Sequence, residues 1–351
     1  MALYVADPGM LSTVQDEGRQ GFLGSGFTSS GAMDKRAYRK GCSLLGNAAG
    51  AASLEFCLMG PTLRFTHDTY FALTGADFDA RLDGVSVPKN QVVMVRRGQQ
   101  LVVGRALRGM YGYLSVMGGF DEPLVMGSRS TNLKCGVGGH EGRALVRGDV
   151  LWAASQMPGY RPGIWGSAKS VDSAATAGAS CLEGSVGDSD AADLSDAAGY
   201  AVGESTDDAL FYQFDQPFVT LRVVLGPQDD LFTPEGIESF LNCEYEMTAQ
   251  SDRMGARLEG PEITTKHGSD IVSDGIAFGA VQVPNHGKPI IMLADRQTTG
   301  GYAKIATVAS VDIPKLVQCR PGSKVRFQAI SVEEAQDLIR KEALLEKGSV
   351  R

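Results

Sequence analysis

The sequence predicts a mainly β protein with two domains. Glycine supplies 44 of the 351 residues, well above the usual share of about 7%, and helix-length amphipathic patterns are few. The apolar residues form short runs separated by glycine, proline and aspartate, which is typical of short strands joined by tight turns. A chain of 351 residues is too long for one typical hydrophobic core, so we expect two domains that each bury their own core.

The first domain is expected over residues 1–165. It opens with a short strand and a turn, and Asp34 is suited to cap a helix that ends near Gly46. Short apolar runs follow between residues 53 and 104, each bounded by glycine, proline or aspartate. Strands this short and this evenly interrupted suggest a barrel or a sandwich.

A linker is expected at residues 166–209. Of these 44 residues, 25 are alanine, serine or glycine, and none is Ile, Phe, Met or Trp, so the segment has too little apolar surface to fold and we expect disorder. It holds nine acids against one lysine, which equals the net charge of −8 of the whole chain. The two domains are therefore neutral, so nucleic acid is not an expected partner.

The second domain is expected over residues 210–351 and again consists mainly of short strands. A short helix begins at Thr233, where a threonine N-cap precedes a proline and an acid. A last helix begins with the capping box of residues 331–334 (SVEE) and runs towards Glu346. The sequence thus predicts a few short helices and a C-terminal helix on a β scaffold.

The first candidate site lies where a strand of the second domain ends. Residues 289–294 form an apolar run that predicts a buried strand, so the polar residues after it emerge at a strand end. Gln297, Thr298 and Thr299 offer donors and acceptors, and the two glycines that follow let a ligand or another backbone approach closely. The alternative is a hydrogen-bonded hairpin whose polar residues bond to one another, and the run alone favours neither.

Two further residues belong to this candidate site. Asp295 is the candidate general base, although a carboxylate at a strand end more often caps a turn. Gln282, in the stretch 279–284 (GAVQVP), is a candidate for substrate binding. The site as predicted therefore combines one carboxylate with several neutral polar groups.

The second candidate site is the loop of residues 127–131 (GSRST) in the first domain. Ser128, Arg129 and Ser130 beside a glycine have the composition of an anion-binding nest. The alternative is an Arg129 side chain that only bonds loop carbonyls. We favour ligand contact for Arg129 and for residues 297–299.

Two other loops contain an aspartate close to an arginine. Because such residues often pair and hold a loop rigid, we favour a structural role for Asp16 with Arg19 and for Asp252 with Arg253. Arg253 is nevertheless kept among the candidates for substrate binding. Its guanidinium group is able to hold a carboxylate by two hydrogen bonds.

Several chemistries are not expected, because their motifs are missing. The sequence has no P-loop and no Gly-x-Ser-x-Gly motif, so we expect neither a phosphate loop nor a hydrolase nucleophile elbow in this chain. The four histidines have no His or Cys partner at ligand spacing, so no metal is expected. There is no biotin-acceptor motif, so a covalently carried cofactor would arrive on another protein.

The cellular location follows from the cysteines and the apolar runs. Six cysteines lie far apart without a Cys-x-x-Cys pair, and the N-terminus has no signal-peptide pattern, which fits a cytoplasmic protein. No apolar run approaches the ~20 residues that span a bilayer. Contact with a membrane is therefore not expected.

Six motifs in one order resemble a known family. They are residues 15–19 (QDEGR), 30–34 (SGAMD), 127–131 (GSRST), 251–255 (SDRMG), 282–284 (QVP) and 297–302 (QTTGGY). With these motifs the chain resembles the family of the bacterial 5-oxoprolinase C subunit, which is also labelled allophanate hydrolase subunit 2, Kip antagonist or biotin-dependent carboxyltransferase-like. The resemblance covers both domains and omits the linker.

The resemblance implies two cyclophilin-like β-barrel domains and a complex with a Kip-inhibitor-like B subunit. With a separate A subunit, such complexes use ATP to open the lactam of 5-oxoproline to glutamate. The family is also similar to the carboxyltransferase part of urea carboxylase, where carboxybiotin gives its CO2 unit to urea. Both reactions develop negative charge at an amide-like group, a task suited to donors such as Arg129, Thr298 and Thr299.

Three functions stay open at this point. The first is a subunit of an ATP-dependent 5-oxoprolinase complex, active only with its partners on a small lactam or amide substrate. The second is the carboxyltransferase component of a biotin-dependent urea carboxylase or allophanate hydrolase system, with biotin supplied by a partner. The third is a non-enzymatic antagonist that binds a kinase inhibitor. For an enzyme, we expect loops from both domains to converge so that Arg129 and Thr298 face one cavity.

Overall fold

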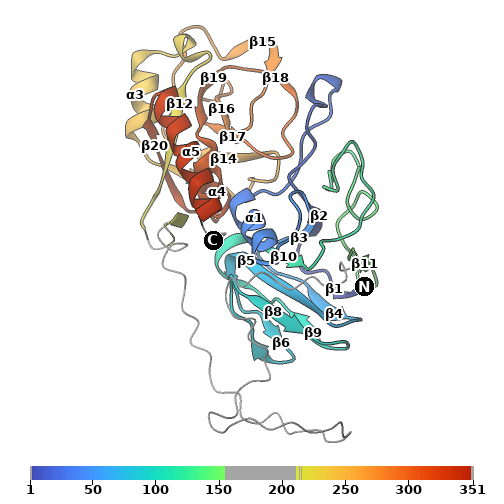
Figure 1. The fold of residues 1–351 in the computed structure, drawn as a ribbon. Helices are drawn as coiled ribbons and strands as arrows, with labels where there is room; N and C mark the ends of the chain where they lie inside the picture. Colours follow the sequence, from blue (N-terminus) through green and yellow to red (C-terminus); the bar gives the residue numbers. More distant parts are fainter. Residues whose placement is uncertain (1, 155–210, 213, 215, 349–351) are drawn as a thin grey trace, which may run out of the picture.

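The computed structural model describes residues 2–154, 211–212, 214 and 216–348. These form a first unit of residues 2–154 and a second unit that follows residue 210 (Figure 1). The predicted linker at 166–209 lies outside the described residues. The predicted domain boundaries at 165 and 210 lie there as well.

The first unit consists of two β-sheets packed face to face. One sheet has the order β11-β1-β4-β9-β6-β7 and the other β2-β3-β10-β5-β8. Leu3 and Phe65 of the first sheet and Phe71 and Leu114 of the second belong to the same buried apolar cluster. The strands are β1 (Ala2–Asp7), β2 (Ser12–Gln15), β3 (Ser53–Cys57), β4 (Thr62–Phe65), β5 (Thr69–Phe78), β6 (Arg81–Leu82), β7 (Val85–Ser86), β8 (Val92–Val95), β9 (Gln100–Val102), β10 (Ala106–Val116) and β11 (Val150–Trp152).

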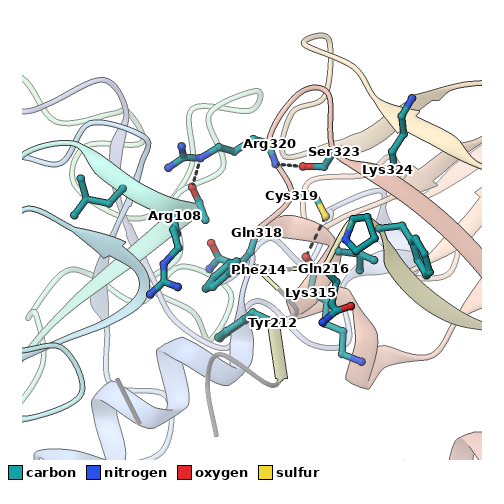
Figure 2. Close-up of a pocket in the computed structure, with 15 residues that line it drawn as sticks. Arg108, Tyr212, Phe214, Gln216, Lys315, Gln318, Cys319, Arg320, Ser323 and Lys324 are labelled. Atoms are coloured by element: carbon teal, nitrogen blue, oxygen red, sulfur yellow. Dashed lines mark hydrogen bonds between the residues drawn. The ribbon is translucent and has the colours of Figure 1, made fainter. Parts of the chain in front are cut away.

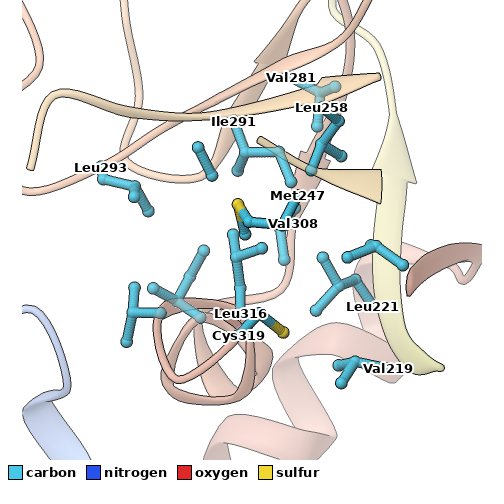
Figure 3. Close-up of a cluster of buried hydrophobic side chains, with 14 of the residues drawn as sticks. Val219, Leu221, Met247, Leu258, Val281, Ile291, Leu293, Val308, Leu316 and Cys319 are labelled. Atoms are coloured by element: carbon cyan, nitrogen blue, oxygen red, sulfur yellow. The ribbon is translucent and has the colours of Figure 1, made fainter. Parts of the chain in front are cut away.

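The second unit is a closed barrel with the strand order β12-β19-β16-β17-β14-β13-β20. A parallel pairing of β12 with β20 closes it. Leu221, Leu258, Ile291 and Val308 point into its interior, which Leu316 covers at one end (Figure 3). The strands are β12 (Val219–Leu225), β13 (Tyr245–Met247), β14 (Gly255–Glu259), β16 (Ala280–Gln282), β17 (Ile290–Met292), β19 (Lys304–Val308) and β20 (Lys324–Ala329), with a separate pair β15 (Asp270–Gly275) and β18 (Thr299–Tyr302).

The helices begin where the sequence predicts. The Asp34 carboxylate accepts a hydrogen bond from the Ala37 amide at the start of α1 (Lys35–Leu44), and Thr233 does the same for Gly236 in α3 (Pro234–Asn242). Ser331 and Glu334 form the reciprocal capping box of α5 (Val332–Gly348). The remaining short helices are α4 (Ile313–Val317) and the 3-10 turns η1 (Leu23–Ser25), η2 (Asp229–Leu231) and η3 (Ser310–Asp312).

The mainly β class, the few short helices and the C-terminal helix are therefore confirmed, whereas two closed barrels are not. The second unit closes, but the first is a pair of open sheets. The physical reason is the shortness of β6 and β7, which have two residues each. In the described residues their ladder ends at β7 and no pairing joins it to β8 of the other sheet, so the barrel stays open there. Backbone bridges from Phe120 to Ala52 and to Ala153 still link the ends of β3 and β11.

The two units are held together by a shared core and by polar contacts. Tyr111 and Tyr113 of the first unit lie in one buried cluster with Leu316 of the second. The Gln318 side chain accepts hydrogen bonds from the amides of Met110 and Tyr111 at 2.8 and 3.0 Å and donates to the Tyr111 carbonyl at 2.9 Å. Helix α1 lies between the sheets and the barrel (Figure 1). The seam between the units is therefore a packed interior.

Candidate functional site

Arg253 of the second unit is the central side chain of the seam. It lies just before β14, is 6% exposed, and donates to Glu55 of β3, to the Asp295 carboxylate at 2.8 Å and to the Gly31 carbonyl at 2.7 Å. Burial lowers the pKa of the Arg253 guanidinium, but the nearby Asp295 and Glu55 carboxylates outweigh this and hold it above its ordinary value. Arg253 thus stays charged and joins both units.

A chain of buried hydrogen bonds continues from Glu55 to helix α1. The Glu55 carboxylate accepts from the Tyr113 hydroxyl at 2.6 Å and from the Met33 amide at 2.8 Å. The Tyr113 oxygen in turn accepts from the Asp34 amide at 2.7 Å. Every partner of this buried carboxylate is thus fixed by a separate element, so the geometry around Arg253 is set by β3, β10 and the start of α1 together.

Asp16 organises the loop that contains Ser128, Arg129 and Ser130. Its carboxylate accepts from the two serine hydroxyls at 2.7 and 2.5 Å, from the Arg129 amide at 2.5 Å and from the Gly18 amide at 2.8 Å. Four donors leave this buried carboxylate fully hydrogen-bonded without a cation. The composition typical of an anion nest is therefore present, and the anion that it holds is Asp16 of the same chain.

The Arg129 side chain points to its own loop. Its Nε donates to the Glu122 carbonyl at 2.8 Å, and Nη2 lies 3.6 Å from the Asp121 carboxylate. These contacts correspond to the alternative in which Arg129 bonds loop groups. Ligand binding by Arg129 stays a prediction, without support from these contacts.

Arg19, and not Arg129, is the arginine whose side chain is buried against this loop. It is 2% exposed, and its Nη2 donates to the Ser130 carbonyl. The predicted pairing of Arg19 with Asp16 is wrong, because the four donors named above occupy the Asp16 oxygens and no hydrogen bond joins the two side chains within the described residues. The Arg19 Nε and Nη1 groups have no hydrogen-bond partner in the described part of the chain.

The two units meet in this region through the segment 28–32. The Thr28 hydroxyl and the Ser30 amide both donate to the Ala294 carbonyl at 3.1 Å. The Asn132 side chain donates to the Ser30 hydroxyl at 3.2 Å. The loop after β17 is therefore attached through residues 28–32 to the loop that carries Ser130. That Arg129 and Thr298 face one cavity stays a prediction.

The strand-end residues occupy different environments. Asp295 is buried against Arg253, whereas Gln297 and Thr299 are exposed and Thr298 is half-buried. Residues 299–302 form β18, which pairs with β15, so the backbone of this stretch is engaged as in the hairpin alternative. A Cβ atom at Gly300 would lie 3.0 Å from the side-chain nitrogen of Gln282 and 3.1 Å from that of Gln297. Because residue 300 is a glycine, these two side-chain amides can lie close together.

Residues 25–329 match the family described as "Carboxyltransferase domain, subdomain A and B". The chain belongs to this family. It is 34% identical to the C subunit of the Escherichia coli 5-oxoprolinase, over 95% of this chain and 93% of the relative. The corresponding C subunit of Haemophilus influenzae is 36% identical over 94% and 92%. The resemblance noted in the six sequence motifs is thus confirmed.

A solved structure gives the same result for the fold. The crystal structure of the K. lactis urea amidolyase matches 99% of this carboxyltransferase-domain chain with a TM-score of 0.79 and 27% sequence identity. This chain spans only 20% of that protein's length. The fold is therefore that of one region within a much larger enzyme.

Glu55 and Arg19 were not among the residues predicted to bind substrate. Glu55 had a usable signal, since it is a lone acid within the buried strand Ser53–Cys57, and buried carboxylates are normally paired. Arg19 had none, because its free donors follow from where Ser130 lies, 111 residues away in the chain.

Another part of the seam holds a cavity of about 260 Å³, and Arg253 is not among the residues that line it (Figure 2). Tyr212, Phe214 and four cationic side chains line it. The cations already have partners: Arg108 bonds Asp77, Lys315 lies 2.9 Å from Asp312, Lys324 lies 2.6 Å from Glu246, and Arg320 donates to the carbonyls of Gly109 and Ala106. The cavity therefore presents little uncompensated charge to an anion.

Two further observations concern metals and membranes. Among the residues that the structure describes, no group of three or more His, Cys, Asp or Glu side chains is placed to hold a metal ion. In the same residues, every helix is too short or too polar to cross a bilayer.

Proposed function

We propose that the chain is a subunit of an ATP-dependent 5-oxoprolinase complex that opens the lactam of 5-oxoproline to glutamate. The observation that carries the proposal is the match to two 5-oxoprolinase C subunits over 93% and 92% of their length. The urea amidolyase structure, in contrast, is matched over 20% of its length. Relatives that are themselves one subunit of an enzyme imply partners, and we propose an A subunit together with a Kip-inhibitor-like B subunit in this role.

We place the substrate at the seam, next to Asp295 and Arg253. The support is that two loops of the first unit and one of the second meet there around buried charges. Asp295 remains the proposed base, since it is the carboxylate on the loop that joins both units. The proposed substrate contacts are Arg253 with Ser128, Arg129, Ser130, Gln282, Gln297, Thr298 and Thr299.

We assign the binding of ATP to a partner protein of the complex, because the sequence of this chain has no P-loop. Phosphates commonly bind at free helix N-termini. Here the Asp34 carboxylate already accepts from the first turn of α1, and a phosphate would meet that negative charge. Thr233 likewise caps α3. The cytoplasmic location and the cyclophilin-like character of the two units are further parts of this proposal.

The second candidate is a carboxyltransferase component of a biotin-dependent urea carboxylase or allophanate hydrolase system. It is favoured by the family description and by the TM-score of 0.79 to urea amidolyase. Carboxybiotin, delivered by a partner, would supply an activated carboxyl group. The unpaired donors of Arg19 fit such a carboxylate, and the residues of this chain would orient it.

Copurification with the partner subunits tests the proposal. The complete complex should release glutamate and hydrolyse ATP when 5-oxoproline is added, and omission of any one component should abolish both. ATP hydrolysis that depends on urea and on a biotinylated partner would instead support the second candidate. A tight complex with no activity on either substrate would support the antagonist and contradict an enzymatic role.

A further inference from the structure

The Arg19 guanidinium is a buried cation with unused hydrogen-bond donors. It is 2% exposed, and of its three nitrogens only Nη2 has a partner among the described residues, the Ser130 carbonyl. A buried donor without a partner destabilises the fold, and more so when it is charged. Such groups are few in folded proteins, and each requires an explanation, such as an ordered water, an ion or a functional role.

The carboxylates nearest to Arg19 are already engaged. Burial lowers the pKa of Arg19, and the charges of Asp16 and Asp295 offset this only in part. The Asp16 oxygens accept from four neutral donors, and the Asp295 oxygens face Arg253. Neither carboxylate therefore satisfies the Arg19 Nε and Nη1 groups.

Gly138 packs closely against the Arg19 guanidinium. Gly138 has a φ of +72°, and a Cβ atom there would lie 2.0 Å from the Arg19 Nη2 and 2.2 Å from the Ser130 carbonyl. Any other residue at 138 would press on the guanidinium and on the backbone that holds it. Glycine at this position therefore lets the backbone pass close to Nη2 and leaves its hydrogen bond to the Ser130 carbonyl undisturbed.

We propose that Arg19 is the receptor for a small carboxylate bound at the seam between the two units. The identity of the ligand rests on the proposed function, which makes it the carboxylate of 5-oxoproline. A guanidinium donates to a carboxylate with charge-assisted hydrogen bonds. Arg19 acts as a binding residue here, and Asp295, on the loop attached to residues 28–32, lies on the other side of the same seam.

Binding measurements with matched ligands test this assignment. Calorimetry on the full chain, and on its complex with the partner subunits, is carried out with 5-oxo-L-proline, with 2-pyrrolidinone, which is the same lactam without the carboxylate, and with acetate. We expect 5-oxoproline to bind at least about tenfold more tightly than 2-pyrrolidinone. Arg19→Met should weaken 5-oxoproline binding about 10- to 100-fold and leave 2-pyrrolidinone unchanged, the range expected for a charged hydrogen-bond donor.

Controls separate loss of binding from loss of fold. Arg147→Met removes one positive charge from an exposed arginine that only lies 3.5 Å from Asp7, and it should bind 5-oxoproline like the wild type. Arg19→Lys keeps the charge but not the fork of donors, so it should fall between wild type and Arg19→Met. Circular dichroism of each variant shows whether the fold is kept.

The outcomes distinguish this inference from the proposed function. If 5-oxoproline binds but Arg19→Met and Arg19→Lys keep its full affinity, the receptor assignment is overturned while the function stands. If acetate binds in an Arg19-dependent way but 5-oxoproline has no advantage over 2-pyrrolidinone, Arg19 is a carboxylate receptor and the proposed substrate is wrong. Absence of carboxylate binding by both the chain and the complex overturns the receptor.

Discussion

Arg19 and Arg253 are two buried arginines, one from each unit, and both interact with the charge of Asp295. Arg253 donates to Asp295, Glu55 and the Gly31 carbonyl, so each of its nitrogens has a partner. Arg19 has a single partner for three nitrogens in the described part of the chain. The comparison teaches that burial alone does not tell the two arginines apart, whereas an account of the hydrogen bonds separates one whose nitrogens all have partners from one with donors to spare.

The largest change in stability is expected when Arg253 is replaced. Arg253→Met leaves the Glu55 and Asp295 carboxylates buried without their cation, so the free energy of unfolding should fall by about 3–5 kcal/mol. Urea denaturation followed by tryptophan fluorescence or circular dichroism measures it. A loss below about 1 kcal/mol would show that Arg253 does not hold the units together.

A pH effect is expected next, at Asp34. Burial raises the pKa of its carboxyl from 3.8 to about 6, although Ala37, Gln318 and Tyr212 donate to it. The folded protein therefore binds this proton more tightly than the unfolded chain. The stability it contributes is fully present below about pH 4 and is lost as the pH rises through about 6, a change on the order of 2–3 kcal/mol.

The Asp34→Asn variant isolates this contribution. It keeps a side chain able to cap α1 but does not titrate, so the difference in unfolding free energy between wild type and variant should change between about pH 4 and pH 6. Wild type should lose stability relative to the variant as the pH rises. Parallel pH profiles for the two proteins would contradict the raised pKa.

A smaller effect on stability is expected at Arg19. Arg19→Met loses the bond to the Ser130 carbonyl but also removes donors that have no partner, so the free energy of unfolding should change by no more than about 1 kcal/mol. The same denaturation series that is used for Arg253→Met measures it. A loss as large as that of Arg253→Met would mean that both arginines are structural.

The smallest effect is expected at Arg129. Its side chain bonds the Glu122 carbonyl and lies near Asp121 on the same loop, and contacts of this partly exposed kind contribute about 0–1 kcal/mol. Arg129→Ala should therefore change stability little, and it should weaken 5-oxoproline binding less than Arg19→Met does. The reverse order would restore the ligand contact predicted for Arg129 from the sequence and would contradict the distinct roles of the two buried arginines.

The sequence predicted what depends on neighbouring residues. The caps at Asp34, Thr233 and Ser331 were visible because a cap acts within a few residues of itself. The strand before Asp295 was visible from its apolar run. The convergence of loops was suggested by the resemblance, since six motifs from both units occur in one order.

The sequence could not predict which charges meet across the seam. Arg253 pairs with Glu55, which is 198 residues away, and the nearby Asp252 instead accepts from the amides of Met254 and Gly255. Asp16 likewise makes no bond to Arg19 and accepts from the hydroxyl groups of residues 128 and 130. Pairings of this kind depend on the packed arrangement of both units, so proximity in the chain gave the wrong partner.

The affinity of Arg19→Met for 5-oxo-L-proline, measured beside its free energy of unfolding, tests most directly whether Arg19 binds the ligand. We predict a protein that keeps its stability within about 1 kcal/mol and loses about 10- to 100-fold in affinity. A stable Arg19→Met protein that binds 5-oxoproline as tightly as the wild type would contradict this role.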